Sequence, residues 1–240
     1  EQEVMLVAPH FQSDDTAQSD EFYWSGNSWR EGQPSNSMAK ISSFEAVDQI
    51  ISQMSDKDKY PSMERVIITG HSSGGLYTHL YAAANESENT YPGLNFTYIV
   101  ANSQYFYYPD GRRIDESNNQ LYTPTGCTGY DIWPQGYSVV PSYLSNTSMT
   151  EFNEQLVNRS IIYLLGNGDG PDGALNPTDC AATLLGATRF SRGKNMYRYM
   201  ELVYGAAHNH TEEIVEGVGH NGLGMYQSAE FRALLSDLLD

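Results

Sequence analysis

The chain has 240 residues, enough for a domain with a buried core, and a formal net charge of -17 from 13 Lys and Arg against 30 Asp and Glu. This charge argues against nucleic acid or anionic lipid as a partner, because both are bound through clustered cations. No stretch approaches the roughly 20 consecutive apolar residues of a membrane-spanning helix. We therefore expect a single domain over residues 1–240, with no nucleic acid as partner and no membrane span.

Apolar runs alternate with helical periodicities along the chain. Residues 4–9 form a short apolar run ended by proline, which predicts a buried strand, and residues 11–43 are typical of a long polar loop. Further strands are predicted at 65–69, 96–101, 160–165 and 211–216, and helices at 44–54, 75–84, 149–157, 178–204 and 227–239. Residues 103–148 are irregular, and we expect them to form a cap-like insertion. This alternation indicates a mostly parallel α/β sheet flanked by helices, in which sites lie at the carboxyl ends of the strands.

The pentapeptide Gly70-His71-Ser72-Ser73-Gly74 stands between a predicted strand and a predicted helix. A serine on such a turn is held in a strained conformation with its hydroxyl exposed, and flanking glycines let the backbone turn without a clash. The start of the following helix adds partial positive charge where an oxyanion would form. This context predicts Ser72 as a nucleophile, with a Gly/Ser-rich turn packed for steric reasons as the alternative.

A serine hydroxyl becomes a good nucleophile when a base takes its proton, and the chain offers six histidines for this role. His220 follows the last predicted strand, within a Gly-rich loop at the end of the sheet where the serine lies. His71 adjoins the serine, but neighbouring side chains on such a turn point apart. The sequence therefore predicts His220 as the general base, with a solvated loop histidine as the alternative.

The acid that orients the base is expected after the preceding strand. Asp169 comes four residues after that strand, and Asp172 and Asp179 lie further along the same loop. We predict Asp169 and keep the other two as alternatives. The Asn, Gly and Asp residues of this loop lack the spacing of a calcium-binding loop, so no metal is expected.

The chain order Ser72, Asp169, His220 is the order of the α/β-hydrolases. From about residue 3 to its C-terminus, the sequence resembles this superfamily, and more narrowly its poorly characterised hydrolase-like members. The segments that carry the resemblance are VAPHF at 7–11, GHSSGG at 70–75, VANS at 100–103, LLG at 164–166, DCAA at 179–182 and GVGH at 217–220. The resemblance implies the roles of nucleophile, acid and base for these three residues. It also implies that Cys127 and Cys180 lie close together, and we expect a disulfide between them.

The superfamily has more strands before its nucleophile strand than this chain offers, so the first N-terminal strands are expected to be lacking. One of the absent loops would supply an oxyanion N–H donor. Three explanations stay open: a longer precursor with a missing N-terminal segment, a partner chain that supplies the strands, or a second donor from Phe11 in the turn at 9–11. The N–H of Ser73, directly after the nucleophile, is the first donor in each case.

The resemblance implies a serine hydrolase that cleaves carboxylic esters, small or polymeric, without a cofactor, and the elbow is similar to that of lipases, cutinases and polyester hydrolases. An amidase or peptidase with the same triad stays open, as does a non-catalytic binding protein on a hydrolase scaffold. Four aromatic residues are candidates for a substrate-facing wall, with ordinary packing as the alternative: Trp24, Trp29, Tyr105 and Phe106.

N-glycosylation sequons suggest a secreted glycoprotein. Five asparagines begin an N-x-S/T sequon: Asn85, Asn95, Asn146, Asn158 and Asn209. The number exceeds chance expectation only modestly, and composition alone does not separate a secreted protein from one of a saline setting. We therefore expect a secreted protein.

Overall fold

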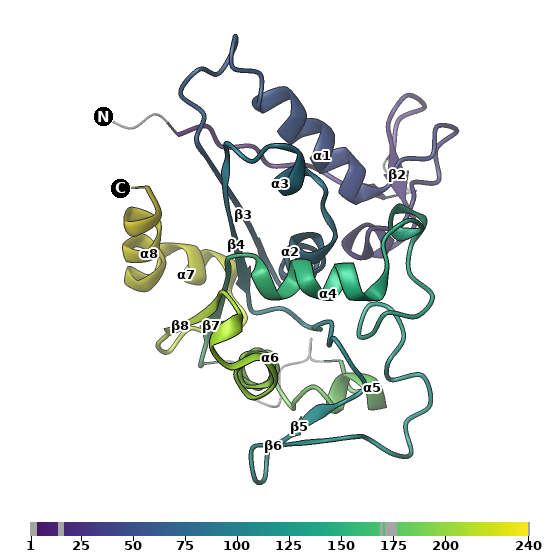
Figure 1. The fold of residues 1–240 in the computed structure, drawn as a ribbon, viewed down its shortest axis with the longest axis vertical. Helices are drawn as coiled ribbons and strands as arrows, with labels where there is room; N and C mark the ends of the chain where they lie inside the picture. Colours follow the sequence, from purple (N-terminus) through teal and green to yellow (C-terminus); the bar gives the residue numbers. More distant parts are fainter. Residues whose placement is uncertain (1–3, 14–16, 169, 171–176, 240) are drawn as a thin grey trace.

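The computed structural model describes residues 4–13, 17–168, 170 and 177–239. A four-stranded parallel sheet with the strand order β3-β4-β7-β8 forms its centre. These strands are β3 (Arg65–His71), β4 (Asn95–Ala101), β7 (Ile161–Gly166) and β8 (His210–Val215). Because they run parallel, their carboxyl ends meet at one end of the sheet (Figure 1). The predicted parallel α/β architecture is confirmed.

Helices and two small sheets surround these strands (Figure 1). The helices are α1 (Ser43–Met54), α2 (Ser73–Ala84), α3 (Ser87–Thr90), α4 (Met149–Asn158), α5 (Cys180–Thr183), α6 (Arg189–Tyr204), α7 (Gly222–Gln227) and α8 (Ala229–Leu239), with 3-10 turns η1 (Ser28–Glu31), η2 (Ser142–Leu144) and η3 (Gly205–Ala207). The small sheets pair β1 (Gln12–Ser13) with β2 (Tyr23–Trp24), and β5 (Arg113–Asp115) with β6 (Gln120–Tyr122).

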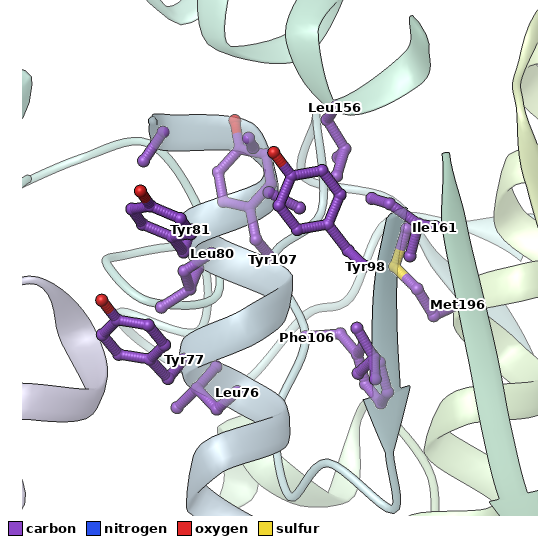
Figure 2. Packing of buried hydrophobic residues seen from close by; sticks show 14 of the residues in the cluster. Leu76, Tyr77, Leu80, Tyr81, Tyr98, Phe106, Tyr107, Leu156, Ile161 and Met196 are labelled. Carbon is purple, nitrogen blue, oxygen red and sulfur yellow. The ribbon is translucent and has the colours of Figure 1, made fainter. Parts of the chain in front are cut away.

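Side chains alternate between two apolar layers, as the period of two along a strand requires. Tyr98 and Val100 of β4 pack on one face with α1, α2, α4 and α6, whereas Ile99 and Ala101 pack on the other with α7 and α8. Figure 2 shows side chains of the first layer, among them Leu76 and Leu80 of α2 and Tyr98 of β4. Figure 1 shows α7 and α8, in yellow, on the opposite side of the sheet from α2 and α4. The sheet is therefore buried on both faces.

The predicted helix over 178–204 is two helices, α5 and α6. Gly186 lies between them with a φ of 138°, a backbone conformation that other residues rarely adopt. Thr188 then starts α6 afresh, because its side chain accepts from the N–H of Ser191 while the Ser191 side chain accepts from the N–H of Thr188. A second departure is α7, a short helix in a Gly-rich stretch that Asn221 caps.

Residues 4–9 do not form the buried strand predicted from their composition. The apolar side chains from Val4 to Val7 are exposed, with Leu6 at 91 %. An apolar run becomes a strand when a neighbour pairs with its backbone, and among the described residues β3 pairs with β4 and not with this segment. The prediction was wrong because strand formation depends on a partner that a local pattern does not reveal.

The segment 103–148 is irregular, as predicted, and holds the β5–β6 hairpin and η2 as its regular elements. Cys127, within it, is bonded to Cys180 at the start of α5, which confirms the expected disulfide. The bond ties this segment to the chain that follows β7. Among the described residues no helix is both long and apolar enough to cross a membrane.

Two histidines are core residues at a distance from the serine turn. His210 is 4 % exposed, and its Nε2 donates to the Leu156 carbonyl at 2.7 Å while its Nδ1 lies 3.0 Å from the Tyr163 hydroxyl. These contacts satisfy the neutral ring with the proton on Nε2. Burial lowers the pKa of His210 to about 3 and that of His79, which is fully buried, to about 4. Both rings are therefore neutral in the folded protein at neutral pH.

We expect the free energy of unfolding to fall as the pH drops from 6.5 towards 4. In this window the unfolded chain protonates both histidines and the folded protein does not, so each costs roughly 3 kcal/mol by pH 4.5. Urea unfolding at pH 7.5 and 4.5 measures this change. His210→Gln, which does not titrate, should be less stable at pH 7.5 but lose less on acidification, whereas His10→Gln, at an exposed position, should behave as wild type. An equal loss in wild type and His210→Gln would contradict the assignment.

Candidate active site

The turn from β3 into α2 holds Ser72 in an unusual backbone conformation. Its φ is 60° and its ψ is -114°, and residues other than glycine rarely adopt such a positive φ. Strain of this kind costs about 1–3 kcal/mol and persists only where the surroundings fix it. The Ser72 N–H donates to the Ala101 carbonyl of β4 at 3.0 Å, and its own carbonyl accepts the first helical bond, from Leu76. This is the geometry that exposes a serine hydroxyl at a strand-to-helix turn.

Close backbone contacts fix this turn. A Cβ atom on Gly70 would lie 2.2 Å from the Gly74 carbonyl oxygen, and one on Gly75 would lie 2.7 Å from the Ala101 carbonyl oxygen. A Cβ on Gly74, by contrast, would meet no atom within 4 Å. Ser73 is the first residue of α2, so its N–H is among those that a helix start leaves without an intrahelical acceptor.

His220 lies in the loop between β8 and α7, and its imidazole reaches the serine turn. Its ring is stacked on that of His71, with the ring centres 4.6 Å apart and an angle of 28° between the planes. His71 is the last residue of β3 and directly precedes Ser72. The structure thus brings His220 to the turn, and it also brings His71, which the sequence reasoning set aside as a base, into contact with it. Burial, together with the positive charges of His220 and Arg189, lowers the pKa of His71 to about 4.

Amide side chains join the loops at this end of the sheet. Asn102, directly after β4, is fully buried at a φ of 41°; its Oδ1 accepts from the N–H of Gly166 at 2.9 Å, and its Nδ2 donates to the carbonyl of Gly219 at 3.4 Å. Asn167, after β7, accepts from the N–H of Gly217 at 2.7 Å. The loop that carries His220 is therefore held from two neighbouring strands. The sequence reasoning missed both asparagines, although each follows a predicted strand at the end where sites lie.

Of the three candidate acids, Asp169 and Asp172 lie outside the described residues. Asp179 has another role: its Oδ1 accepts from the N–H of Ala182 at 3.0 Å and caps α5, while its Oδ2 lies 3.5 Å from the Tyr105 hydroxyl. Both of its carboxylate oxygens are thereby occupied. Among the residues that the structure describes, no three His, Cys, Asp or Glu side chains gather closely enough to hold a metal ion.

Two of the four predicted wall residues belong to the core. Trp24 is 3 % exposed, and its ring N–H donates to the Gln33 carbonyl at 2.8 Å. Phe106, one of the side chains in Figure 2, is fully buried, and it packs edge-on against Tyr163 and His79. Because neither ring is exposed, both residues have the role of core packing that the sequence analysis gave as the alternative.

The other two wall residues, Trp29 and Tyr105, are half-buried. Trp29 stacks on Phe11 with the ring centres 5.1 Å apart, and Phe11 also contacts Tyr77 of α2 at 5.4 Å. Tyr105 lies under the guanidinium of Arg30, 5.8 Å from its ring centre. The described contacts thus bring Phe11 and Trp29 against the helix that begins at the serine turn, and they leave part of the Trp29 and Tyr105 rings accessible.

A hollow of about 620 Å³ lies at the opposite end of the sheet, where β4, β7 and β8 begin. Its lining includes Asn95, Asn158 and His208. The lining also contains Ser160 and His210, but both ring nitrogens of His210 have partners and Ser160 does not have a positive φ. We therefore locate the candidate active site at the carboxyl end, where the strained serine and the stacked histidines lie.

No protein-family model and no curated protein sequence matches the chain. Two solved structures resemble it: the poly(3-hydroxybutyrate) depolymerase LpqC from Bordetella parapertussis, with 17% identity and a TM-score of 0.57, and poly(aspartic acid) hydrolase-1 from Sphingomonas sp. KT-1, with 18% identity and a TM-score of 0.55. The likeness covers 78% of this chain in both cases, but 54% and 61% of those proteins. The chain has the α/β-hydrolase fold. The expected fold is therefore confirmed over a length that spans between half and two thirds of these neighbours.

In this α/β-hydrolase fold, the two glycines of the serine motif should respond differently to alanine. Gly70→Ala should disrupt the turn, because its Cβ would overlap the Gly74 carbonyl; we expect a lower melting temperature and loss of labelling by a serine-directed fluorophosphonate probe. Gly74→Ala should be tolerated and should stabilise α2 by up to ~1 kcal/mol. Thermal unfolding and probe labelling of both variants measure this. Equal tolerance at the two positions would show that the turn is not held by this contact.

Proposed function

We propose that the chain is a serine hydrolase that cleaves neutral carboxylic esters by acyl transfer. The observation that carries the proposal is the strained backbone of Ser72 between β3 and α2, with the imidazole of His220 at the same turn. A strained serine at the start of a helix, with a histidine nearby, is the arrangement that nucleophilic catalysis requires. A turn packed only for steric reasons would not need the histidine.

In the proposed reaction, Ser72 Oγ attacks the ester carbonyl carbon while His220 takes its proton. The tetrahedral intermediate carries its negative charge on the former carbonyl oxygen, where the Ser73 N–H and the helix dipole of α2 stabilise it. His220 then gives the proton to the leaving alcohol, and water releases the acid by the same steps in reverse. Asp169 is the proposed acid that orients the imidazole and stabilises its cation. Phe11 is the proposed source of the second oxyanion donor.

The substrate class follows from the neighbours and from charge. One neighbour is described as acting on a polyester and the other on poly(aspartic acid), so polymers are among the substrates to test. A chain of net charge -17 repels a polyanion, which favours a neutral polyester over poly(aspartic acid). The half-buried rings of Trp29 and Tyr105 are proposed to form the apolar part of the substrate surface.

The test compares labelling by a fluorophosphonate probe in wild type and four variants. We expect Ser72→Ala to abolish labelling, and His220→Ala and Asp169→Asn to slow it by roughly 10³–10⁴-fold because the base is lost or misoriented. Asp179→Asn is the matched control: its carboxylate caps α5, so labelling should stay within about threefold of wild type. Absence of labelling in wild type between pH 6 and 9 would favour a binding protein on this scaffold.

Turnover then separates the proposed substrates. We expect hydrolysis of p-nitrophenyl butyrate and of a neutral polyester, with poly(aspartic acid) and the matching p-nitroanilide at least tenfold slower. Faster cleavage of the anilide would instead assign an amidase that uses the same residues.

The disulfide and the sequons also support secretion, which we propose together with N-glycosylation. Four of the five sequon asparagines are exposed: Asn95, Asn146, Asn158 and Asn209. Asn85 is fully buried and donates to the Tyr81 carbonyl and the Tyr98 hydroxyl. After production in a eukaryotic secretory host, we expect peptide mapping to find glycans at exposed sequons and none at Asn85. Occupancy at Asn85, or at none of the five, would contradict this.

A further inference from the structure

The contact between the two imidazoles joins residues from different strand ends. His71 ends β3, and His220 lies 149 positions later, in the loop after β8. Their ring centres are 4.6 Å apart with the planes inclined by 28°, so the rings lie face to face. At this separation the face of one ring limits how far the other can tilt or turn.

The surroundings of His71 indicate that it contacts its neighbours through the face of its ring rather than through a hydrogen bond from Nε2. Its Nε2 is buried and has no hydrogen-bond partner among the described residues. A Cβ at Gly222, in the helix that follows His220, would lie 3.2 Å from its Nδ1, so the absence of a side chain there leaves room for the ring. The ring is thereby fitted between β3 and the loop that carries His220 without a polar contact through Nε2 to hold it.

The charges near His71 indicate which form of its ring is present. Among the described residues, the groups that act electrostatically on His71 are His220, from the β8–α7 loop, and Arg189, from the start of α6. Gly222, which also lies against His71, carries no charge. Burial, the positive charge of Arg189 and the charge that His220 carries when protonated all disfavour protonation of His71, and its ring stays neutral near pH 7. The face of a neutral aromatic ring attracts a cation.

We propose that His71 is a positioning residue for His220: its neutral ring holds the imidazole of the base against the serine turn and stabilises the imidazolium that forms when Ser72 attacks. This inference rests on the proposed function. It assigns to His71 no proton transfer and no contact with the substrate. Its contribution appears when His220 becomes charged, so it should affect the turnover number rather than substrate binding.

The experiment compares kcat, KM and pH profiles for p-nitrophenyl butyrate hydrolysis in three variants. His71→Phe keeps an aromatic face and should retain at least a third of the wild-type kcat. His71→Gln has a side chain of similar size without an aromatic face, and its kcat should fall at least tenfold while KM stays within twofold. His71→Lys puts a cation beside His220; kcat should fall further, and the acidic limb of the profile should move to lower pH by at least 0.5 units.

Thermal unfolding of each variant, with His208→Gln at the far end of the sheet as a control, checks that the fold is intact. If a variant does not fold, the position of the His220 ring protons in the NMR spectrum of the wild type supplies a second measurement, because stacking on His71 should shift them upfield. Equal kcat in the Gln and Phe variants, or a loss confined to KM, would overturn the inference. Absence of probe labelling in the wild type would instead overturn the proposed function.

Discussion

The backbone of Ser72 depends on three elements that over-determine it. β3 ends directly before Ser72 and α2 begins directly after it, in a new direction. The Ala101 carbonyl of β4 accepts a hydrogen bond from the Ser72 N–H. The Gly74 carbonyl lies so close to Gly70 that a Cβ there would overlap it. A positive φ that costs about 1–3 kcal/mol is stable here because relaxing it would break the packing of a helix on two central strands. The position of the Ser72 side chain is therefore a consequence of the sheet, and the rest of the candidate site is arranged around it.

The other parts of the site reach the serine through the parallel register. Loops that follow parallel strands begin at the same end of the sheet, but their tips are not held by the strand ladder. In this molecule amide side chains join them: Asn102 links β4 to the Gly166 and Gly219 backbones, and Asn167 links the β7 loop to Gly217. A buried amide satisfies both a donor and an acceptor, so it can fix two loops at once where an apolar side chain would fix neither. The position of His220 follows from these links.

Sequence patterns correctly predicted the helices and strands whose conformation depends mainly on their own residues. The strand, turn and helix around Ser72 followed from an apolar run, two glycines and a helical stretch, and β4 and β7 from their apolar runs. The strand predicted at 211–216, whose sequence is more polar, is also present as β8. The strand at 4–9 was wrong because pairing depends on a distant neighbour. Trp24 and Phe106 could not be assigned to core or surface, because exposure depends on what the tertiary fold lays over a side chain. The sequence prediction for His71 considered only the adjacent residues of the turn, whereas its stacking partner His220 lies in the loop after β8, the strand at the other edge of the sheet.

The two ends of the sheet use histidine in opposite ways. At the amino end, His210 is closed in by Leu156 and Tyr163, so its neutral form is fixed and its protonation opposes folding. At the carboxyl end, His220 is half-buried and its ring rests on that of His71, which stays neutral. Acid destabilises the fold, because the folded protein opposes protonation of its core histidines. Acid also lowers the proposed activity, because a general base acts in its neutral form. The fold therefore keeps its full stability above about pH 6.5, the ordinary pKa that the two core histidines have in the unfolded chain.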